Sequence, residues 1–100
     1  MTSDKLQQAR SFETQYAAFI PDAERPAFHV TAAIGWINDP NGFSCYKGEY
    51  HLFFQYHPYS TEWGPMHWGH VKTRDFIRWE RLPAAIAPDT DADRDGCFSG

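Results

Sequence analysis

The feature that most constrains this chain is the tetrapeptide Asp-Pro-Asn-Gly at residues 39–42. A type I turn favours Asp or Asn at its first position, Pro at its second and Gly at its fourth, so this order predicts a tight turn. Pro40 fixes its own φ and biases Asp39 towards an extended conformation. We therefore expect Asp39 to be the last residue of a strand, held rigidly close to Trp36.

Two interpretations of Asp39 follow from this turn. A carboxylate on a rigid backbone beside an indole and two amides is suited to binding a sugar or reacting with it. The plainer alternative is that Asp39 only caps its own turn through its side chain, as Asp commonly does. Turn chemistry alone favours the plainer alternative, so the rest of the chain has to decide between them.

The first part of the chain is expected to be helical. Residues 4–20 place apolar side chains at three- and four-residue steps, with Asp4 as the expected N-cap and Pro21 ending the helix. Residues 21–26 form a polar linker. The expected apolar stripe, which should pack on the rest of the protein, consists of Leu6, Ala9, Phe12, Tyr16, Phe19 and Ile20.

From Phe28 onwards the chain is typical of β structure. Lys47-Gly48 predicts a two-residue hairpin turn, and Pro83 and Pro88 are expected to break the chain after the last strand. Alternation along the strand after that turn should direct Tyr50, Leu52, Phe54 and Tyr56 to one face. Short antiparallel strands joined by tight turns form a meander of the size of one propeller blade. The expected strands are residues 28–34, 43–46, 49–56, 66–73 and 77–82.

Composition narrows the classes of partner. The 100 residues are 42% hydrophobic and 17% aromatic, and the net charge is −4 without a basic stripe, so nucleic acid and anionic membrane surfaces are disfavoured as partners. Residues 1–10 are polar, which predicts neither a signal peptide nor a membrane span and hence a cytoplasmic protein. In that compartment Cys45 and Cys97 are expected to be free thiols.

Two clusters raise the question of a metal. His67 and His70 lie three residues apart, which in a strand puts them on opposite faces, so a shared metal is not expected. Asp91, Asp93 and Asp95 match the opening of a calcium loop, but the position of the closing Glu would fall beyond residue 100, and Pro83 and Pro88 disfavour a flanking helix. We therefore predict a solvated acidic loop at residues 89–96.

A resemblance decides the question of Asp39. Residues 35–42, Gly-Trp-Ile-Asn-Asp-Pro-Asn-Gly, resemble the signature of the fructosidases of glycoside hydrolase family 32, which include invertases, sucrose-6-phosphate hydrolases, levanases and inulinases. Matching blocks follow in the same order at residues 54–58, 63–70, 75–79 and 96–100. Several blocks in the right order are far more specific than one motif. Ile37 stands where Met is often seen and Ala32 where Pro is often seen, and neither departure removes a polar group.

The resemblance also implies a fold. The family folds its all-β catalytic domain as a five-bladed β-propeller, so residues 28–100 would be the first part of that domain. Residues 1–27 would be a short N-terminal α-helix and its linker. A lone four-stranded sheet with aromatic side chains on both faces cannot bury both faces, and it leaves open edges. We therefore expect this chain to be a fragment of a larger domain.

The chemistry that the resemblance implies is retaining hydrolysis of the terminal fructoside of sucrose or sucrose 6-phosphate. Such a reaction needs two carboxyls about 5 Å apart, one ionised nucleophile and one protonated acid. The resemblance makes Asp39 the nucleophile. The family takes its acid from a downstream Glu-Cys motif that is absent here, so the isolated chain is expected to be inactive. Glu62, beside Trp63, is the one tempting substitute within the chain.

A sugar pocket without cofactor or metal completes the implied site. Amides would bond fructose hydroxyls, aromatic rings would wall the sugar, and a serine hydroxyl would help to close the pocket. For Trp63 and Phe98 the plainer alternative is core packing, since large aromatic side chains are usually buried. Asn41 would either steady the turn or touch the sugar. The implied substrate-binding residues are Asn38, Asn41, Gln55, Trp63, Phe98 and Ser99.

Several alternatives stay open at this point. Sucrose, sucrose 6-phosphate and fructan ends present the same fructose, and nothing places Lys47, Lys72 or Arg74 near the pocket to select a phosphate. Fructosyl transfer would use a sugar hydroxyl in place of water. A non-catalytic sugar-binding module and a structural piece that docks through its helix are the two non-enzymatic alternatives. The sequence does not indicate an oligomeric state.

Overall fold

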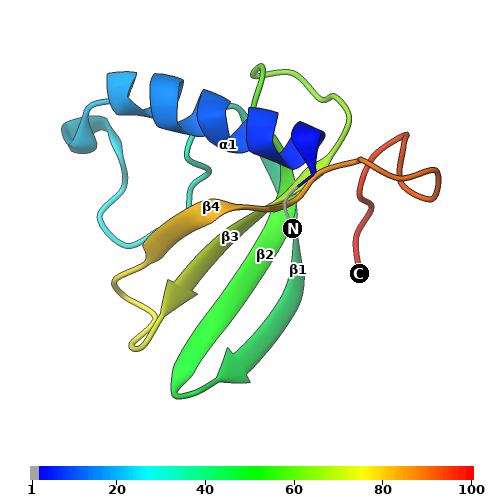
Figure 1. Ribbon diagram of the computed structural model, residues 1–100. Coiled ribbons are helices and arrows are strands. Elements are labelled where there is room, and N and C mark those ends of the chain that lie inside the picture. Colours follow the sequence, from blue (N-terminus) through cyan, green and yellow to red (C-terminus); the bar gives the residue numbers. More distant parts are fainter. Residues whose placement is uncertain (1–2) are drawn as a thin grey trace.

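The computed structural model describes residues 3–100 as one helix packed on a four-stranded antiparallel sheet (Figure 1). The strands lie side by side in the order β1-β2-β3-β4, which confirms the predicted meander behind an N-terminal helix. Within residues 3–100, no helix has the length and apolar character needed to cross a membrane. The elements are α1 (Asp4–Tyr16), 3-10 helices η1 (Ala17–Phe19) and η2 (Asp22–Glu24), β1 (Trp36–Tyr46), β2 (Glu49–His57), β3 (His67–Thr73) and β4 (Glu80–Ile86).

Helix α1 begins at the predicted residue, but its N-cap and its end differ from the prediction. Ser3, not Asp4, is the N-cap, because its short hydroxyl side chain accepts a hydrogen bond from the Leu6 N–H at 3.2 Å. The α-helix ends at Tyr16 and tightens into η1, so the predicted helix over residues 4–20 is too long. Of the predicted stripe only Leu6 and Ala9 are buried, and Phe19 is 77% exposed.

One face of the sheet carries the core, and α1 lies across this face near β4 (Figure 1). The alternation predicted for β2 is confirmed, because Phe54 and Tyr56 are buried here and Leu52 packs against them. The buried apolar cluster joins α1, the segment before β1 and three strands. Its members are Leu6, Ala32, Phe54, Tyr56, Val71, Ala84 and Ala87.

Side chains of α1 also cover the edge strand β4. Arg10 Nε donates to the Ala84 carbonyl at 2.9 Å, and a Glu13 carboxylate oxygen accepts from the Ala84 N–H at 3.0 Å. Lys5 donates to the Pro88 carbonyl at 3.0 Å. An edge strand presents backbone groups that would otherwise pair with another chain. The helix therefore occupies hydrogen-bonding positions that an additional strand would use.

The burial of Glu13 gives a pH-dependent prediction. Burial raises the pKa of Glu13 above its usual value. Such a group adds stability below its unfolded pKa, and this contribution is lost as the pH rises through the folded pKa. The quantity to follow is the free energy of unfolding of the wild type minus that of Glu13→Gln. We expect this difference to increase as the pH falls from neutrality through the range in which Glu13 titrates. Urea unfolding at a series of pH values measures this difference. Glu24→Gln, at an exposed position, is the matched control, and a pH-independent difference for Glu13→Gln would contradict the prediction.

The predicted turn at residues 39–42 is wrong, because β1 runs through it as a continuous strand. Pairing with β2 slips by one residue between Ile37 and Pro40, and again between Asn41 and Ser44, which marks two bulges. Gly42, with φ +55°, adopts the left-handed conformation that a bulge can require. Pro40 is tolerated because β1 is an edge strand, on which one row of backbone groups is unpaired.

Residues 28–34 do not form the predicted strand. The Arg25 guanidinium donates to the carbonyls of Ala32 and Ala33. These carbonyls therefore bond a side chain and not the backbone of a neighbouring strand. Gly35, with φ +78°, then redirects the chain into β1.

Strand β4 also starts later than predicted and includes Pro83. Asp75 holds residues 77 and 78 in the turn before it, because one carboxylate oxygen accepts from the N–H groups of Ile77 and Arg78, both at 2.9 Å. The other predicted turn is confirmed, because Lys47 and Gly48 join β1 to β2 with φ values of +52° and +78°.

Candidate active site

The first bulge of β1 determines where Asp39 lies. Ile37 pairs with Tyr56 and Pro40 pairs with Phe54, so two residues of β1, Asn38 and Asp39, oppose the single residue Gln55 of β2. Both Asn38 and Asp39 are exposed. A bulge re-aims side chains, which a regular strand would send to alternate faces. Asp39 is therefore held by the pairing of the edge strand β1 with β2, in place of the turn that the sequence predicted.

Asn38 is oriented by its neighbour in the motif. Trp36 Nε1 donates to the Asn38 side-chain oxygen at 2.7 Å. Because this bond uses the amide oxygen, the amide N–H groups of Asn38 remain available as donors. Asn38 and Trp36 thus lie together within the same segment of β1 as Asp39.

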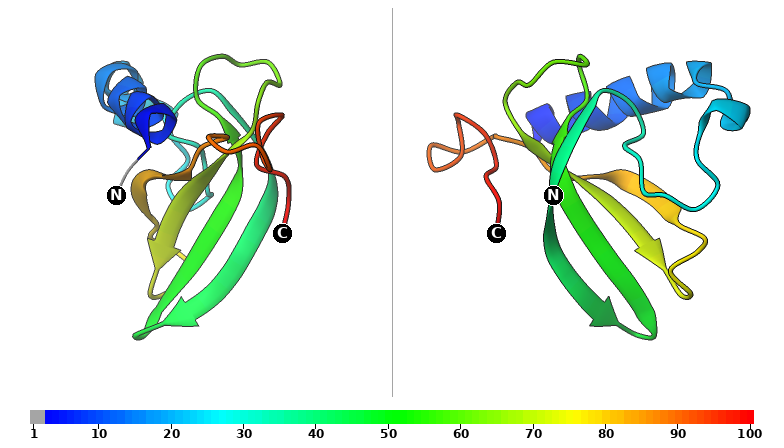
Figure 2. Two further views of the ribbon diagram at one scale, coloured as in Figure 1. Left: turned by 45° about the vertical axis from the view of Figure 1, so that its right-hand side comes forward. Right: turned by 180° about the vertical axis from the view of Figure 1, so that it is seen from behind.

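The C-terminal segment, residues 96–100, returns beside β1 (Figure 2). Ser99 Oγ lies 3.5 Å from Asp39 Oδ2, at the limit of a hydrogen bond. The Gly42 N–H donates to the Gly100 carbonyl at 3.2 Å, and the Asn41 side-chain oxygen accepts from the Gly100 N–H at 3.4 Å. Asn41 is only 3% exposed, so it holds this junction and does not face solvent.

Gln55 is buried beneath the same segment. Its amide nitrogen donates to the Cys97 carbonyl at 2.6 Å, and the residue is 3% exposed. This bond anchors residues 96–100 to β2, a role that the sequence does not reveal. The fructose contact predicted for Gln55 stays a prediction, with one amide donor already used inside the chain.

Trp63 and Phe98, the aromatic side chains predicted to wall the sugar, are not core residues. Phe98 is 67% exposed and Trp63 is 58% exposed. Phe98 belongs to the segment that contacts Asp39, whereas Trp63 lies in the loop between β2 and β3. Within residues 3–100, Trp63 forms no side-chain hydrogen bond with Asp39, Asn38 or Ser99. The structure thus gathers Asn38, Asp39, Phe98 and Ser99, and leaves Trp63 on a separate loop.

Neither Glu62, the predicted substitute, nor Glu13, whose pKa is raised, is joined to Asp39. The pKa of Glu13 is raised by burial on the side of α1 that packs on β4, and β4 is the opposite edge of the sheet from β1. Glu62 is exposed, and its N–H bonds the Ser60 hydroxyl at 3.0 Å within the loop. The raised pKa of Glu13 is therefore a consequence of helix packing.

The residues considered as metal ligands make other contacts. His67 Nδ1 lies 3.1 Å from the Pro65 carbonyl, whereas His70 meets His51 of the neighbouring strand β2. His51 Nδ1 and His70 Nε2 lie 3.0 Å apart, and burial lowers the pKa of His70. Asp93 accepts from the N–H and hydroxyl of Thr90, both at 2.8 Å. Across residues 3–100, no group of three or more His, Cys, Asp or Glu side chains is placed to hold a metal ion.

The two cysteines are free, as predicted. Cys45 is exposed and Cys97 is buried, and burial together with the nearby Asp93 raises the pKa of Cys97 to about 12. Cys97 is therefore a protonated, packed thiol that supports the segment carrying Phe98 and Ser99.

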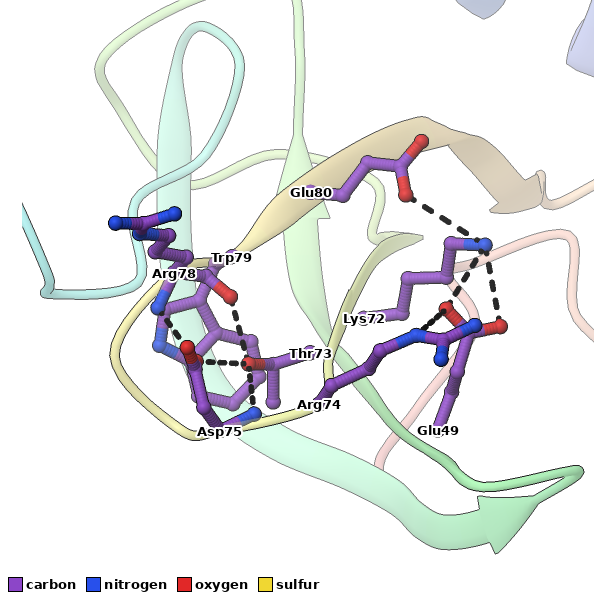
Figure 3. A pocket seen from close by; sticks show the side chains of 8 residues that line it. All are labelled: Glu49, Lys72, Thr73, Arg74, Asp75, Arg78, Trp79 and Glu80. Carbon is purple, nitrogen blue, oxygen red and sulfur yellow. Dashed lines mark hydrogen bonds and ion pairs between the residues drawn. The ribbon is translucent and has the colours of Figure 1, made fainter.

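A hollow at the other end of the sheet is lined by paired charges (Figure 3). Lys72 lies 3.3 Å from Glu49 and 3.5 Å from Glu80, so one ammonium pairs with both carboxylates. Arg74 also approaches Glu49, at 3.6 Å. Glu49 begins β2 and Gln55 lies near its end, so the hollow is about 20 Å along the strand from the row of Asp39.

Comparison with known proteins places this geometry in a family. The Glycosyl hydrolases family 32 N-terminal domain matches residues 29–100. A sucrose-6-phosphate hydrolase of Zymomonas mobilis is 64% identical over 75 residues, 75% of this chain and 15% of the relative. A sucrose-6-phosphate hydrolase of Escherichia coli is 43% identical over 100% of this chain and 21% of the relative. The chain belongs to glycosyl hydrolase family 32.

Solved structures agree with this assignment. A family 32 beta-fructofuranosidase of Bombyx mori, solved in complex with sucrose, matches 99% of this chain and 20% of its own length, with 42% identity and a TM-score of 0.84. A sucrose-6-phosphate hydrolase from Lactobacillus gasseri matches 99% of this chain and 19% of its own, with 33% identity and a TM-score of 0.71. The chain thus spans about a fifth of these solved relatives.

Proposed function

We propose that residues 28–100 are the first blade of a five-bladed β-propeller catalytic domain, preceded by a helix and linker at residues 1–27. Two observations support this proposal. The relatives are much longer than this chain, and the sheet face opposite α1 keeps Phe53, Trp68 and His70 partly exposed. Further blades would give these side chains something to pack against. The cytoplasmic location stays a prediction.

We further propose that the complete protein is a retaining beta-fructofuranosidase with Asp39 as its nucleophile. The observation that carries this proposal is an exposed Asp39 carboxylate that follows Asn38 in the bulge and lies 3.5 Å from the Ser99 hydroxyl. The carboxylate would attack the anomeric carbon of fructose, and the bond to the leaving sugar oxygen would break as that oxygen takes a proton. Water would then hydrolyse the fructosyl-enzyme bond.

The other residues of the proposed site come partly from this chain and partly from sequence outside it. Asn38, Gln55 and Ser99 would bond fructose hydroxyls, and Trp63 and Phe98 would wall the ring. Asn41 would act through the junction with Gly100 that it holds. The general acid would come from a later part of the protein, so the chain by itself is proposed to be inactive.

Sucrose or sucrose 6-phosphate is the proposed substrate, and fructan hydrolysis or fructosyl transfer is the alternative within the same chemistry. Relatives named sucrose-6-phosphate hydrolase and levanase support this range. Lys72 and Arg74 do not supply a phosphate site, because they pair with Glu49 in the hollow about 20 Å from Gln55. Any selection for a phosphorylated sugar would come from other residues.

Trapping of the covalent intermediate tests the proposal. A slow fluorinated fructoside should label the complete protein once per active site, and peptide mass spectrometry should locate the label on Asp39. The fluorine slows both formation and hydrolysis of the fructosyl-enzyme, and a reactive leaving group on the probe restores the first step, so the fructosyl-enzyme accumulates. The matched control is Asp39→Asn, which should take up no label. A label on any other carboxylate, or no label in a protein that hydrolyses sucrose, would refute the assignment.

A further inference from the structure

The segment that carries Ser99 is held by a row of residues across the sheet. Asn38 and Asp39 oppose Gln55, and Gln55 pairs with Trp68 on β3. Paired residues on adjacent antiparallel strands point to the same face. Gln55 donates to the Cys97 carbonyl at 2.6 Å, and Trp68 Nε1 donates to the next carbonyl, that of Phe98, at 3.2 Å. Two neighbouring side chains therefore bond two successive peptide groups.

The ring of Trp68 is also in contact with both parts of the site. A Cβ added to Gly42 would lie 3.4 Å from the indole, and one added to Gly100 would lie 3.6 Å from it, so the ring packs close to both backbones. Gly42 and Gly100 are themselves joined by a hydrogen bond of 3.2 Å. Phe53 packs on the same indole, with ring centroids 5.7 Å apart. Trp68 thus fills the junction between the Asp39 motif and the final segment.

Ser99 depends on these neighbours for its position. Its hydroxyl reaches Asp39 at 3.5 Å, and the adjacent Phe98 ring is 67% exposed and so gives little packing. The Phe98 carbonyl, which Trp68 holds, belongs to the peptide group that joins Phe98 to Ser99. A shift of this carbonyl would move the Ser99 hydroxyl away from Asp39. The distance between the hydroxyl and the carboxylate is already at the limit of a hydrogen bond, so a longer distance would break it.

We propose that Trp68 is a positioning residue, whose indole N–H fixes the Phe98 carbonyl so that Ser99 meets the Asp39 carboxylate. This inference rests on the proposed function. A hydroxyl donor stabilises the ionised form of a carboxylate nucleophile and limits the directions in which it can attack. Trp68 would touch neither the sugar nor the reacting atoms, and its effect would pass through Ser99.

The test compares three variants of the complete protein, namely Trp68→Phe, Ser99→Ala and the double variant. Trp68→Phe keeps an aromatic ring but removes the N–H donor. We expect Trp68→Phe to lower kcat for sucrose about tenfold, the order of one lost hydrogen bond, with a smaller change in KM. The acidic limb of the kcat/KM profile should move to higher pH, because the ionised carboxylate loses a donor. Ser99→Ala should move it the same way, and the double variant should move it no further.

Trp79→Phe is the matched control, since Trp79 packs beside Phe76 far from the Asp39 row, and its pH profile should stay unchanged. Thermal unfolding of each variant separates misfolding from loss of positioning. Additive effects in the double variant, or a lower melting temperature with an unmoved pH profile, would overturn the role of Trp68 while leaving the proposed function intact. If the wild type fails to hydrolyse any fructoside, the proposed function is wrong and this inference is wrong with it.

Discussion

Replacing Asp39 by Asn in the complete protein should lower kcat for sucrose by at least about 1,000-fold, the order seen when the nucleophile of a covalent mechanism is removed. Asn has the same shape but no charge, so it cannot form the fructosyl-enzyme bond. Sugar binding should survive, because Asn38 and Ser99 remain. Initial-rate kinetics with sucrose, together with binding of a non-hydrolysed sugar, measure the two effects separately.

Asp95→Asn is the matched control for this experiment. Asp95 is an exposed carboxylate in the acidic turn at residues 89–96, so the same loss of charge should leave kcat unchanged. Near-wild-type activity of Asp39→Asn would remove Asp39 from the mechanism. A parallel loss in both variants would instead point to a general effect of charge.

The largest expected effect on stability is that of Gly35→Ala. Gly35 has φ +78°, which disfavours a side chain, and its Cβ would clash with the His57 carbonyl and lie 3.0 Å from the Pro58 backbone. Backbone atoms cannot move aside as the end of a flexible side chain can. The left-handed conformation and the clash together should lower the free energy of unfolding by about 4 kcal/mol. Urea unfolding measures this loss.

Gly48→Ala separates the two causes. Gly48 has the same φ of +78°, but a Cβ there would meet nothing within 4 Å. It should therefore lose only the conformational part, about 1 kcal/mol. The difference between the two variants measures the clash alone. Equal losses would show that the close approach of Gly35 to the end of β2 does not matter for stability.

The parts of the fold that could be predicted from sequence are those decided within a few residues. Lys47 and Gly48 form the expected hairpin turn because their positive φ values are a local property. The alternation of β2 and the start of α1 within one residue have the same origin. The motif blocks indicated the family for a related reason, since they preserve residue types in a fixed order along the chain.

The errors arose where a contact outside the segment itself overrode its local signal. The Asp-Pro-Asn-Gly stretch has turn chemistry, yet pairing with β2 keeps it in a bulged strand. The segment before β1 has strand composition, yet Arg25 takes two of its carbonyls. Pro83 lies in β4, where α1 covers the outer edge of that strand.

By itself, the sequence determined the family and the meander and indicated the residues of the proposed fructose site, because these depend on local order and spacing. Only the tertiary structure decided how those residues are used. Gln55 is buried under Cys97, Asn41 is committed to Gly100, and Trp68 joins the site through a carbonyl 30 residues away in the chain. The hydrogen-bond partner of a side chain depends on which backbone packs over it. For Asn41, Gln55 and Trp68 this backbone is the segment of residues 96–100, which reaches them only in the folded protein.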